Sequence, residues 1–180
     1  MAELMEAIKN RRSIRVYEEK EIPEDVFNQV LEAVRWSPSW ANTQCWEIVA
    51  VKDPAVKQKL QETLVKTNPA RKAIVEAPVV LALAGKLKSS GYYKGESSTS
   101  LGDWYMFDLG LAAQTLCLAA QDLGLGTVMV GLYDVDKAAE VIGVPADHQL
   151  VTLIPMGYVA KDSKAPKRRE VSEFTHENRF

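Results

Sequence analysis

Two clusters of basic residues lie at opposite ends of the 180-residue sequence, Arg11–Arg15 (R-R-S-I-R) and Lys167–Arg169 (K-R-R). Guanidinium groups beside a hydroxyl supply forked donors and positive charge, a combination that suits a phosphate monoester. In an extended segment alternate residues share a face, so Ser13 and Arg15 can point together while Ile14 points into the core. The alternative for both clusters is solvated surface charge.

Two loop-like segments could present a surface to a ligand. Ser37–Trp46 contains turn formers, amides and two indoles, and it lies between a predicted helix and a predicted strand. Such a loop can offer backbone amides and flat apolar surface to an aromatic ligand, or it can be a tight structural connection. Gly85–Gly102 is the one long loop-like stretch, and loops of that length tend to be functional or mobile. Its tyrosines, Tyr92 and Tyr93, could contact a substrate or pack within the loop.

The sequence contains no motif for side-chain catalysis. His148 and His176 are its only histidines and are isolated, so we expect neither a histidine metal site nor a catalytic triad. It has no P-loop, G-x-S-x-G or H-E-x-x-H motif. The Gly124–Gly126 segment lacks the spacing of a dinucleotide fingerprint and is typical of a helix C-cap. Cys45 and Cys117 have no metal-type spacing, which predicts buried, reduced thiols. If the protein is an enzyme, we expect a bound cofactor to carry the chemistry.

Composition predicts one soluble globular domain over residues 1–180. The sequence is 47% hydrophobic and 26% charged, and its 22 basic and 24 acidic residues give a net charge of −2. A net charge so near zero argues against broad nucleic-acid binding. The acidic start of the sequence does not resemble a signal peptide, and no apolar run is long enough to span a bilayer. These features predict a cytoplasmic protein.

Hydrophobic periodicity predicts the elements that must position these residues. We expect helices over 2–10, from 22–25 to just before Ser37, and over 54–66, 68–76, 104–123 and 135–142, with strands over 46–51, 78–84, 127–132 and 150–157. Their irregular alternation indicates an α+β sandwich with a mixed central sheet flanked by helices. Helix 104–123 is apolar on nearly every side, and Asp108, Gln114 and Thr115 interrupt it. Such a helix is buried on several faces, so we expect it to pack against a second subunit.

The order of these features resembles the nitroreductase-like FMN flavoprotein family along nearly the whole chain. R-R-S-I-R follows a short N-terminal helix, and P-S-x-x-N-x-Q-x-W begins at Pro38. Arg71-Lys72 precedes a strand that begins A-P-V-V. The run D-x-x-x-A-x-Q-x-L-x-L-A-A-x-x-L-G-L-G spans Asp108–Gly126, and P-M-G-Y at Pro155–Tyr158 precedes a basic tail.

The resemblance implies an α+β homodimer with two FMN sites at the subunit interface. It implies that the FMN phosphate and pyrimidine edge contact Arg11, Arg12, Ser13 and Arg15, with Lys167 and Arg169 completing the phosphate site. The partner subunit would supply Pro38, Ser39, Trp40 and Asn42 to line the flavin. Lys72 would lie near flavin N1 and O2, where a cation favours the reduced form. Val130 and Gly131 would approach flavin N5 through their backbone, and Trp40, Tyr92 and Tyr93 would belong to the substrate pocket.

Three positions depart from the family pattern. Trp40 stands where small residues are common, so the pocket is expected to be narrower or built for stacking. Cys45 replaces the usual proline before Trp46, which would loosen that turn. Val130 stands where many relatives have an acidic residue, which puts that contact with the flavin in doubt.

The function that the resemblance implies is an FMN-dependent oxidoreductase with two half-reactions. A hydride passes from NADH or NADPH to flavin N5, and then to an electron-poor acceptor such as a nitroaromatic or a quinone. No catalytic side chain and no metal is required. Two alternatives are a related flavoenzyme with other chemistry, such as ene reduction or reductive dehalogenation, and a non-catalytic FMN-binding or redox-sensing protein.

Overall fold

The computed structural model describes residues 2–180, with side chains from residue 4 onward. The helices within this range are α1 (Ala2–Asn10), α2 (Glu24–Arg35), α3 (Pro54–Thr63), α4 (Arg71–Glu76), α5 (Tyr105–Asp122) and α6 (Val135–Ile142). The strands are β1 (Trp46–Val51), β2 (Val79–Lys86), β3 (Tyr92–Tyr93), β4 (Glu96–Ser97), β5 (Leu125–Thr127) and β6 (His148–Tyr158). Two 3-10 turns are η1 (Trp40–Asn42) and η2 (Val171–Glu173).

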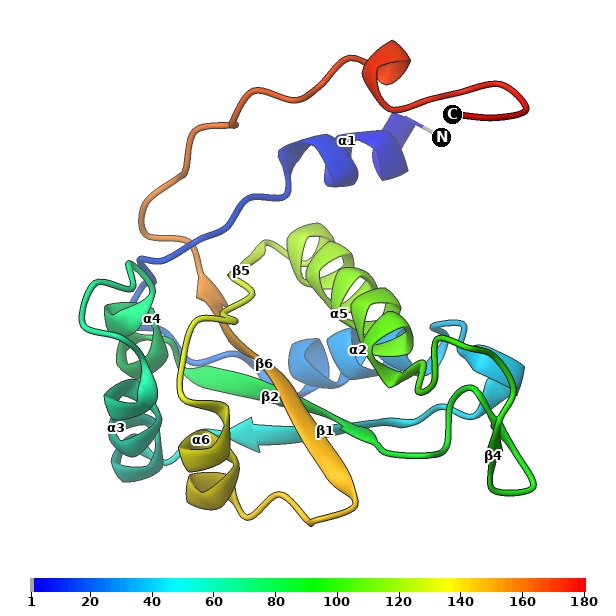
Figure 1. Cartoon of the computed structure of the whole chain (residues 1–180). Coiled ribbons are helices and arrows are strands. Elements are labelled where there is room, and N and C mark those ends of the chain that lie inside the picture. Colours follow the sequence, from blue (N-terminus) through cyan, green and yellow to red (C-terminus); the bar gives the residue numbers. More distant parts are fainter. Residues whose placement is uncertain (1) are drawn as a thin grey trace.

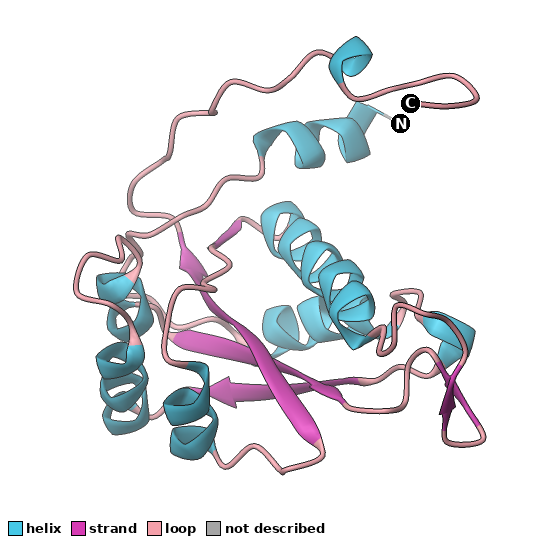
Figure 2. Ribbon diagram, viewed as in Figure 1, coloured by secondary structure: helices cyan, strands magenta, loops and turns pink. Residues whose placement is uncertain are grey.

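The central sheet has the strand order β1-β2-β6-β5, with helices packed on both of its faces (Figures 1 and 2). The α+β class is therefore confirmed. The prediction of a mixed sheet is corrected, because every ladder of this sheet is antiparallel. Within residues 2–180, the parallel pairing is a single isolated bridge between Ser13 and Thr127. The segment that follows α1 thus touches the sheet edge without becoming a strand.

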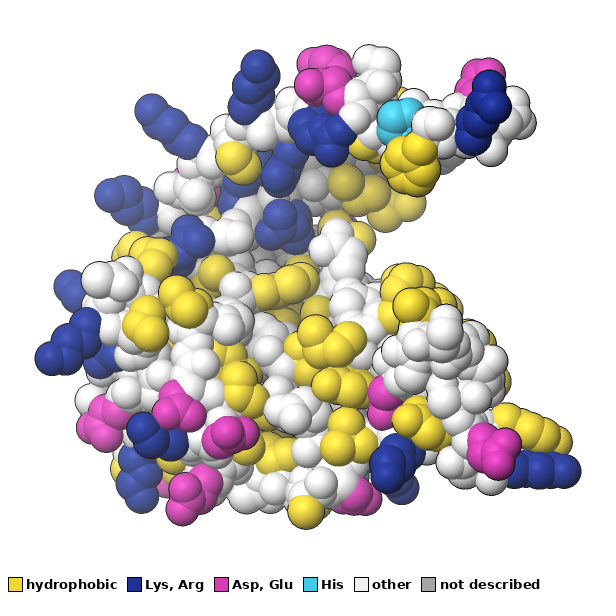
Figure 3. Space-filling view, viewed as in Figure 1, with side chains coloured by type: hydrophobic (Ala, Val, Ile, Leu, Met, Phe, Trp, Pro, Cys, Tyr) yellow, Lys and Arg dark blue, Asp and Glu magenta, His cyan; other side chains and the backbone are white. Residues whose placement is uncertain are grey.

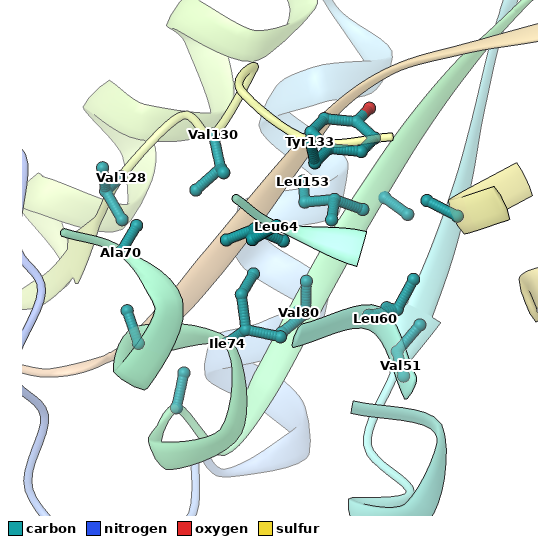
Figure 4. Packing of buried hydrophobic residues seen from close by; sticks show 14 of the residues in the cluster. Val51, Leu60, Leu64, Ala70, Ile74, Val80, Val128, Val130, Tyr133 and Leu153 are labelled. Atoms are coloured by element: carbon teal, nitrogen blue, oxygen red, sulfur yellow. The ribbon is translucent and has the colours of Figure 1, made fainter. Parts of the chain in front are cut away.

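The buried strand β2 divides the core into two layers. Every residue from Val79 to Gly85 is buried, which confirms the expectation of a strand covered on both faces. Val80 and Ala82 pack into a cluster with α3, α4 and α6, part of which is seen in Figure 4. Leu81 and Leu83 point to the other face and pack against α2 and α5. Alternation along one strand thus fills both sides of the sandwich.

Helix α5 is the long buried helix that the sequence predicts. Leu109 and Leu116 are fully buried, whereas Met106 and Phe107 are exposed on its first turns. Gly124 has a φ of +74° just after the helix, which confirms that the glycine pair ends it. No helix among residues 2–180 is both long and apolar enough to cross a bilayer.

The end of the chain extends away from the body as an arm. Ala160 N donates to Val16 O at 3.2 Å, and residues 164–180 are all exposed. Figure 1 shows this arm running beside α1 above the body, and Figure 3 shows an open hollow between that upper part and the body. Val171 and Phe174 on the arm are 68% and 54% exposed. Large apolar side chains at this exposure indicate an interaction surface.

Gly126 sets the position of the segment that carries the first basic cluster. A Cβ atom at Gly126 would lie 2.7 Å from the Cβ of Ile14, which is closer than packed carbon atoms approach. We expect Gly126→Ala to destabilise the fold by about 1–3 kcal/mol, as overpacking of a core does. The midpoint of chemical unfolding measures this loss. Gly110→Ala is the control, because a Cβ atom there meets open space and alanine favours a helix, so its midpoint should not fall. Equal midpoints for the two variants would contradict the prediction.

Candidate functional site

The first basic cluster is held in place by backbone pairing to the sheet edge. Ile14 N donates to Thr127 O at 2.9 Å, and the Ile14 side chain is buried, as alternation predicts. Tyr17 OH donates to Ile14 O at 2.8 Å, or to Pro155 O at 3.0 Å, and ties the segment to β6. The residues on either side of Ile14, Ser13 and Arg15, are therefore turned away from the core.

The arginines of this cluster are half-buried cations without an acidic partner. Arg11, Arg12 and Arg15 are each partly covered, and none takes part in an ion pair within the described residues. Arg12 donates to Arg11 O at 2.9 Å, and Arg15 donates to Ser13 O at 3.1 Å. The Arg15 Nε atom is buried and has no hydrogen-bond partner in the described structure. A buried donor on a cation favours an anionic ligand, so this corner fits a phosphate group.

The same corner holds two further residues that the sequence predicts for the site, Lys72 and Gly131. Asn68 Nδ2 donates to Leu132 O at 2.9 Å, which joins the turn before α4 to the segment that follows β5. Lys72 is exposed in the first turn of α4, and Gly131 is exposed beside Leu132. The bridge between Ser13 and Thr127 brings the arginines to the start of that same segment. The fold therefore gathers the N-terminal cluster, Lys72 and Gly131 around residues 127–132.

Val130 is placed differently from Gly131. Its N–H donates to Leu153 O at 2.9 Å, and its carbonyl accepts from Leu153 N and from Thr152 Oγ1, both at 3.1 Å. Its side chain points into the core near Leu64 (Figure 4). Because the polar groups of Val130 are already bonded within the protein, the exposed backbone of Gly131 is the better candidate for a ligand contact in this segment.

The predicted flavin-lining loop forms a tight, strained turn. Ala41, Asn42 and Gln44 have φ angles of 44°, 56° and 48°, a region that residues other than glycine seldom adopt. Ser39 Oγ accepts from Gln44 N at 2.9 Å and closes the turn. Pro38 is exposed and Ser39 is half-buried at its start. Strain of this kind persists where surrounding contacts over-determine it, and it concentrates at ligand sites.

Asp108 on α5 makes one of the contacts that hold this strained turn in place. Trp40 N donates to Asp108 Oδ1 at 3.1 Å, and the Cys45 thiol donates to Asp108 Oδ2 at 3.5 Å. The Asp108 side chain is fully buried, and no ion pair in residues 2–180 includes it. Cys45 therefore anchors the end of the turn through its thiol.

The long loop packs onto the same turn through Trp104. The rings of Trp40 and Trp104 have centroids 5.1 Å apart, and those of Trp104 and Phe107 lie 5.5 Å apart. Trp104 also donates to Ser90 O and Thr99 Oγ1, each at 3.0 Å. Tyr92 and Tyr93 form one strand of the small hairpin that this loop contains, and Tyr93 is mostly exposed. Trp104 thus connects the predicted substrate residues of the loop to Trp40.

A cavity of about 310 Å³ opens between the turn and the start of α5. It is lined by Pro38, Ser39, Trp40, Trp104, Phe107, Asp108 and Leu111. A larger hollow of about 490 Å³ lies between α3 and α6, where Lys59, Glu62, Lys137 and Glu140 line it. None of the predicted site residues lines that larger hollow, and its walls are mainly charged surface side chains. The cavity beside Trp40 is therefore the better candidate for a ligand.

Helix α5 separates the two halves of the predicted site. Asp108 contacts Trp40 near the start of the helix, whereas Cys117 lies beside Thr127 and Arg11 nine residues further on. Nine residues correspond to about 14 Å of helix. Figure 1 shows the turn near residue 40 and the segment after α1 at opposite ends of α5. One subunit therefore does not bring the two halves together.

The second basic cluster lies on the exposed arm. Lys167 and Arg169 are exposed, and the Arg169 guanidinium donates to Glu173 O within the arm and lies 5.8 Å from the Phe174 ring centroid. Figure 3 shows basic side chains along the arm and on the neighbouring part of the body. Their role in a phosphate site stays a prediction.

Both cysteines are expected to be unreactive in the folded protein. Burial and the neighbouring Asp108 carboxylate raise the pKa of Cys45 to about 12, and burial raises the pKa of Cys117. A raised pKa keeps the thiol protonated at pH 8, where thiolate is the reactive form. We therefore expect Ellman's reagent to label neither thiol in the native protein and both after unfolding. Rapid release of one equivalent from the native protein would contradict this.

Comparison with known proteins decides the family. The model of the nitroreductase family matches residues 8–158, which is most of the chain. The chain belongs to the nitroreductase family. A match of this length includes the first basic cluster, the Ser37–Trp46 turn and the segment after β5, so the family assignment covers both halves of the predicted site.

Relatives within and around the family differ in the activity that their names describe. A Methanothermobacter thermautotrophicus protein, provisionally named as an NADH dehydrogenase/NAD(P)H nitroreductase, is 29% identical over 164 residues, which is 89% of this chain and 79% of that protein. Mouse iodotyrosine deiodinase 1 is 27% identical over 203 residues, covering 95% of this chain and 68% of the deiodinase. The solved structure of an FMN-dependent nitroreductase from Clostridium difficile has a TM-score of 0.80 at 22% identity, with 98% and 99% of the two chains covered. At 22% identity, this similarity shows that the two chains share a fold.

The sequence interpretation missed two residues that the structure places at the candidate site. The sequence gives Asp108 as a polar interruption of an apolar helix and as the start of a family-like run, and Trp104 as the start of that helix, with no site role for either. An acidic residue within an apolar stretch of helix signals a buried contact, because a buried carboxylate needs hydrogen-bond donors. Trp104 carries no comparable signal, since its contacts come from the loop that folds back onto it.

Proposed function

We propose that this protein is an FMN-dependent oxidoreductase that works as a homodimer. It takes electrons from NADH or NADPH and delivers them to a nitroaromatic, a quinone or a similar electron-poor acceptor. The observation that carries the proposal is the set of half-buried arginines around Ser13, which have no acidic partner among the described side chains and include an Nε atom without a hydrogen bond there. In a chain of the nitroreductase family, FMN phosphate is the anion that suits them best.

The residues of the proposed site bind and orient the cofactor. Arg11, Arg12, Ser13 and Arg15 would hold the phosphate and the pyrimidine edge, with Lys167 and Arg169 from an arm. Lys72 would place positive charge near N1 and O2, and Gly131 would offer its exposed backbone. When bound, FMN would accept a hydride from the nicotinamide and pass it to the acceptor. We assign no catalytic side chain and no metal to this chemistry.

The homodimer follows from the separation of the two half-sites. In one subunit the turn with Pro38, Ser39 and Asn42 lies away from the arginines, at the other end of α5. A second copy could bring its turn to these arginines, and a two-fold axis would then create two equal sites. The exposed apolar residues of α1 and of the arm support such an interface: Leu4, Met5, Ile8, Val171 and Phe174.

The function is tested by steady-state turnover. The purified protein should be yellow and should release FMN, not FAD, when it is denatured. Under anaerobic conditions it should oxidise NADH or NADPH in the presence of a nitroaromatic or a quinone. A colourless protein that takes up no added FMN would exclude the proposal. Reduction of the flavin by NAD(P)H without turnover of any acceptor would favour a non-catalytic, redox-sensing role.

Reductive dehalogenation is the second candidate, because iodotyrosine deiodinases are among the relatives. This chemistry would use the same FMN site with a halogenated aromatic acceptor. Release of iodide from 3-iodotyrosine by the reduced protein distinguishes the two candidates. Turnover of nitroaromatics without iodide release would support the first.

A further inference from the structure

We propose that the cavity beside Trp40 binds the aromatic ring of an uncharged acceptor and disfavours acceptors that carry a carboxylate. The cavity is the hollow of about 310 Å³ between η1 and the start of α5. The inference rests on the proposed function, because it assigns the class of acceptor to that same site. It adds Trp104, Phe107 and Asp108 as residues that determine specificity.

The walls of the cavity suit a planar apolar ring. Trp40, Trp104 and Phe107 surround it, with successive ring centroids 5.1 Å and 5.5 Å apart. Pro38 and Leu111 complete an apolar lining, and the volume lies near the lower end of the range for small-molecule sites. Aromatic rings prefer tilted or offset contacts at these distances, so a further ring can join the cluster favourably.

The cavity is preformed on both sides. Trp104 is fixed by hydrogen bonds to Ser90 and Thr99 of the long loop, each 3.0 Å long. The backbone at Trp40 is held by its N–H, which donates to Asp108 Oδ1 at 3.1 Å, and its ring packs against Trp104. Residues held in this way lose little freedom when a ligand binds, which favours selective recognition.

The single charge in the cavity wall is negative. Of the seven lining residues only Asp108 is ionisable as an acid or a base, and none is Lys, Arg or His. The Asp108 carboxylate is fully buried and accepts from two neutral donors, the Trp40 amide and the Cys45 thiol. Within the described residues no cation pairs with Asp108, and a carboxylate buried behind the wall acts more strongly on a nearby charge than an exposed one does. A ligand carboxylate would therefore be repelled, whereas a neutral ligand of the same shape would not.

The position of the cavity links it to the proposed flavin site. Its lining includes Pro38 and Ser39, which belong to the turn that we propose to face the flavin of the partner subunit. A ring bound in this cavity would thus lie next to the cofactor. Asp108 has two effects here, since it also holds the strained turn through Trp40.

A matched pair of ligands tests the charge selection without turnover. 4-Nitrobenzamide and 4-nitrobenzoate share their shape and differ in charge. We measure the dissociation constant of each by equilibrium dialysis against the oxidised, FMN-loaded protein, with no nicotinamide present. We expect the amide to bind at least about tenfold more tightly, because Asp108 opposes only the anion. Equal affinities, or tighter binding of the benzoate, would overturn the proposal.

Three variants locate the origin of the selection. Asp108→Asn keeps an acceptor for Trp40 N–H, and it should reduce the preference for the amide to less than about threefold. Asp122→Asn removes the same charge from the exposed end of α5 and should leave the preference unchanged.

The third variant tests the aromatic wall. Phe107 is 58% exposed, so Phe107→Leu should fold normally and weaken the binding of both ligands by a similar factor. If Asp122→Asn changed the preference as much as Asp108→Asn, or if Phe107→Leu left both affinities unchanged, the assignment would be wrong.

The dialysis measurement also separates this inference from the proposed function. If the protein selects the amide but turns over no acceptor, the cavity assignment stands and the oxidoreductase assignment fails. If it turns over nitroaromatics but binds both ligands equally, the oxidoreductase assignment stands and the cavity assignment fails.

Discussion

Replacing Arg15 or Arg11 with alanine should weaken FMN binding by about thirty-fold to several thousand-fold. Removal of one partner from a buried, hydrogen-bonded charge pair costs about 2–5 kcal/mol. Each ~1.4 kcal/mol corresponds to a factor of ten in affinity. Arg15 is partly buried and its Nε atom has no partner within the described protein, so a bound phosphate would satisfy it. Titration of FMN into the apo variants, followed by flavin fluorescence, measures the loss.

Arg35→Ala is the matched control for these two variants. Arg35 is an exposed residue at the end of α2, and it pairs with Glu32 at 3.1 Å. Loss of a surface ion pair changes stability or binding by no more than about 0.5 kcal/mol in most proteins. Equal FMN affinities for Arg11→Ala, Arg15→Ala and Arg35→Ala would show that the first cluster is solvated surface charge.

A charged residue in place of Ile8 should separate the dimer into monomers and remove bound FMN. Leu4, Met5 and Ile8 form an exposed apolar face on α1, and we place this face in the subunit interface. An interface of the obligate kind buries more than about 2,000 Å² and tolerates an unpaired buried charge poorly. We therefore expect the FMN-loaded protein to have a dimer mass by light scattering at micromolar concentration. Ile8→Asp should raise the dimer dissociation constant more than about a hundredfold and lower FMN affinity in parallel.

Val49→Asp controls for the introduced charge. Val49 is nearly as exposed as Ile8, at 38% against 42%, but it lies on strand β1. This variant should remain a dimer that binds FMN. A monomeric mass for the unmodified FMN-loaded protein would contradict the assembly that we propose.

Local patterns predicted most of the elements because their physical causes are local. Alternation placed Ile14 in the core and its neighbours outside, and the continuous apolar run of β2 indicated burial on both faces. The bounds of β1 and α6 agree with the predicted ranges 46–51 and 135–142. These features depend on the spacing of apolar residues and on capping, which the sequence displays directly.

The predicted strand over 127–132 was wrong in its extent, because long-range pairing determines where a strand ends. Val128 and Val130 are buried while Met129 and Gly131 are exposed, so the alternation itself is present. Yet β5 ends at Thr127, and beyond it Val130 makes only an isolated bridge to Leu153. Alternation shows which side chains are buried but not which backbone partner is within reach.

The candidate site was predicted in part, and the missing part is again a matter of distant contacts. The residue types around Ser13 indicated an anion site, and the structure adds the absence of acidic partners among the described residues. The contact between Asp108 and Trp40 joins residues 68 positions apart, and no local pattern reveals it. The separation of the two half-sites by α5 likewise appears only in the folded chain.

The most direct test of the shared FMN site is complementation between two defective subunits. One variant is Arg15→Ala; the other combines Ser39→Asp and Asn42→Asp, which keep the turn but place negative charge against the flavin. Each homodimer alone should bind little FMN. If each site takes its arginines from one subunit and its turn from the other, each mixed dimer contains one intact site and one doubly defective site. When equal amounts of the two variants exchange at random, half of the dimers are mixed. Tight FMN binding should then return to about a quarter of all sites. No recovery of FMN binding in dimers shown to be mixed would contradict a site shared between two subunits.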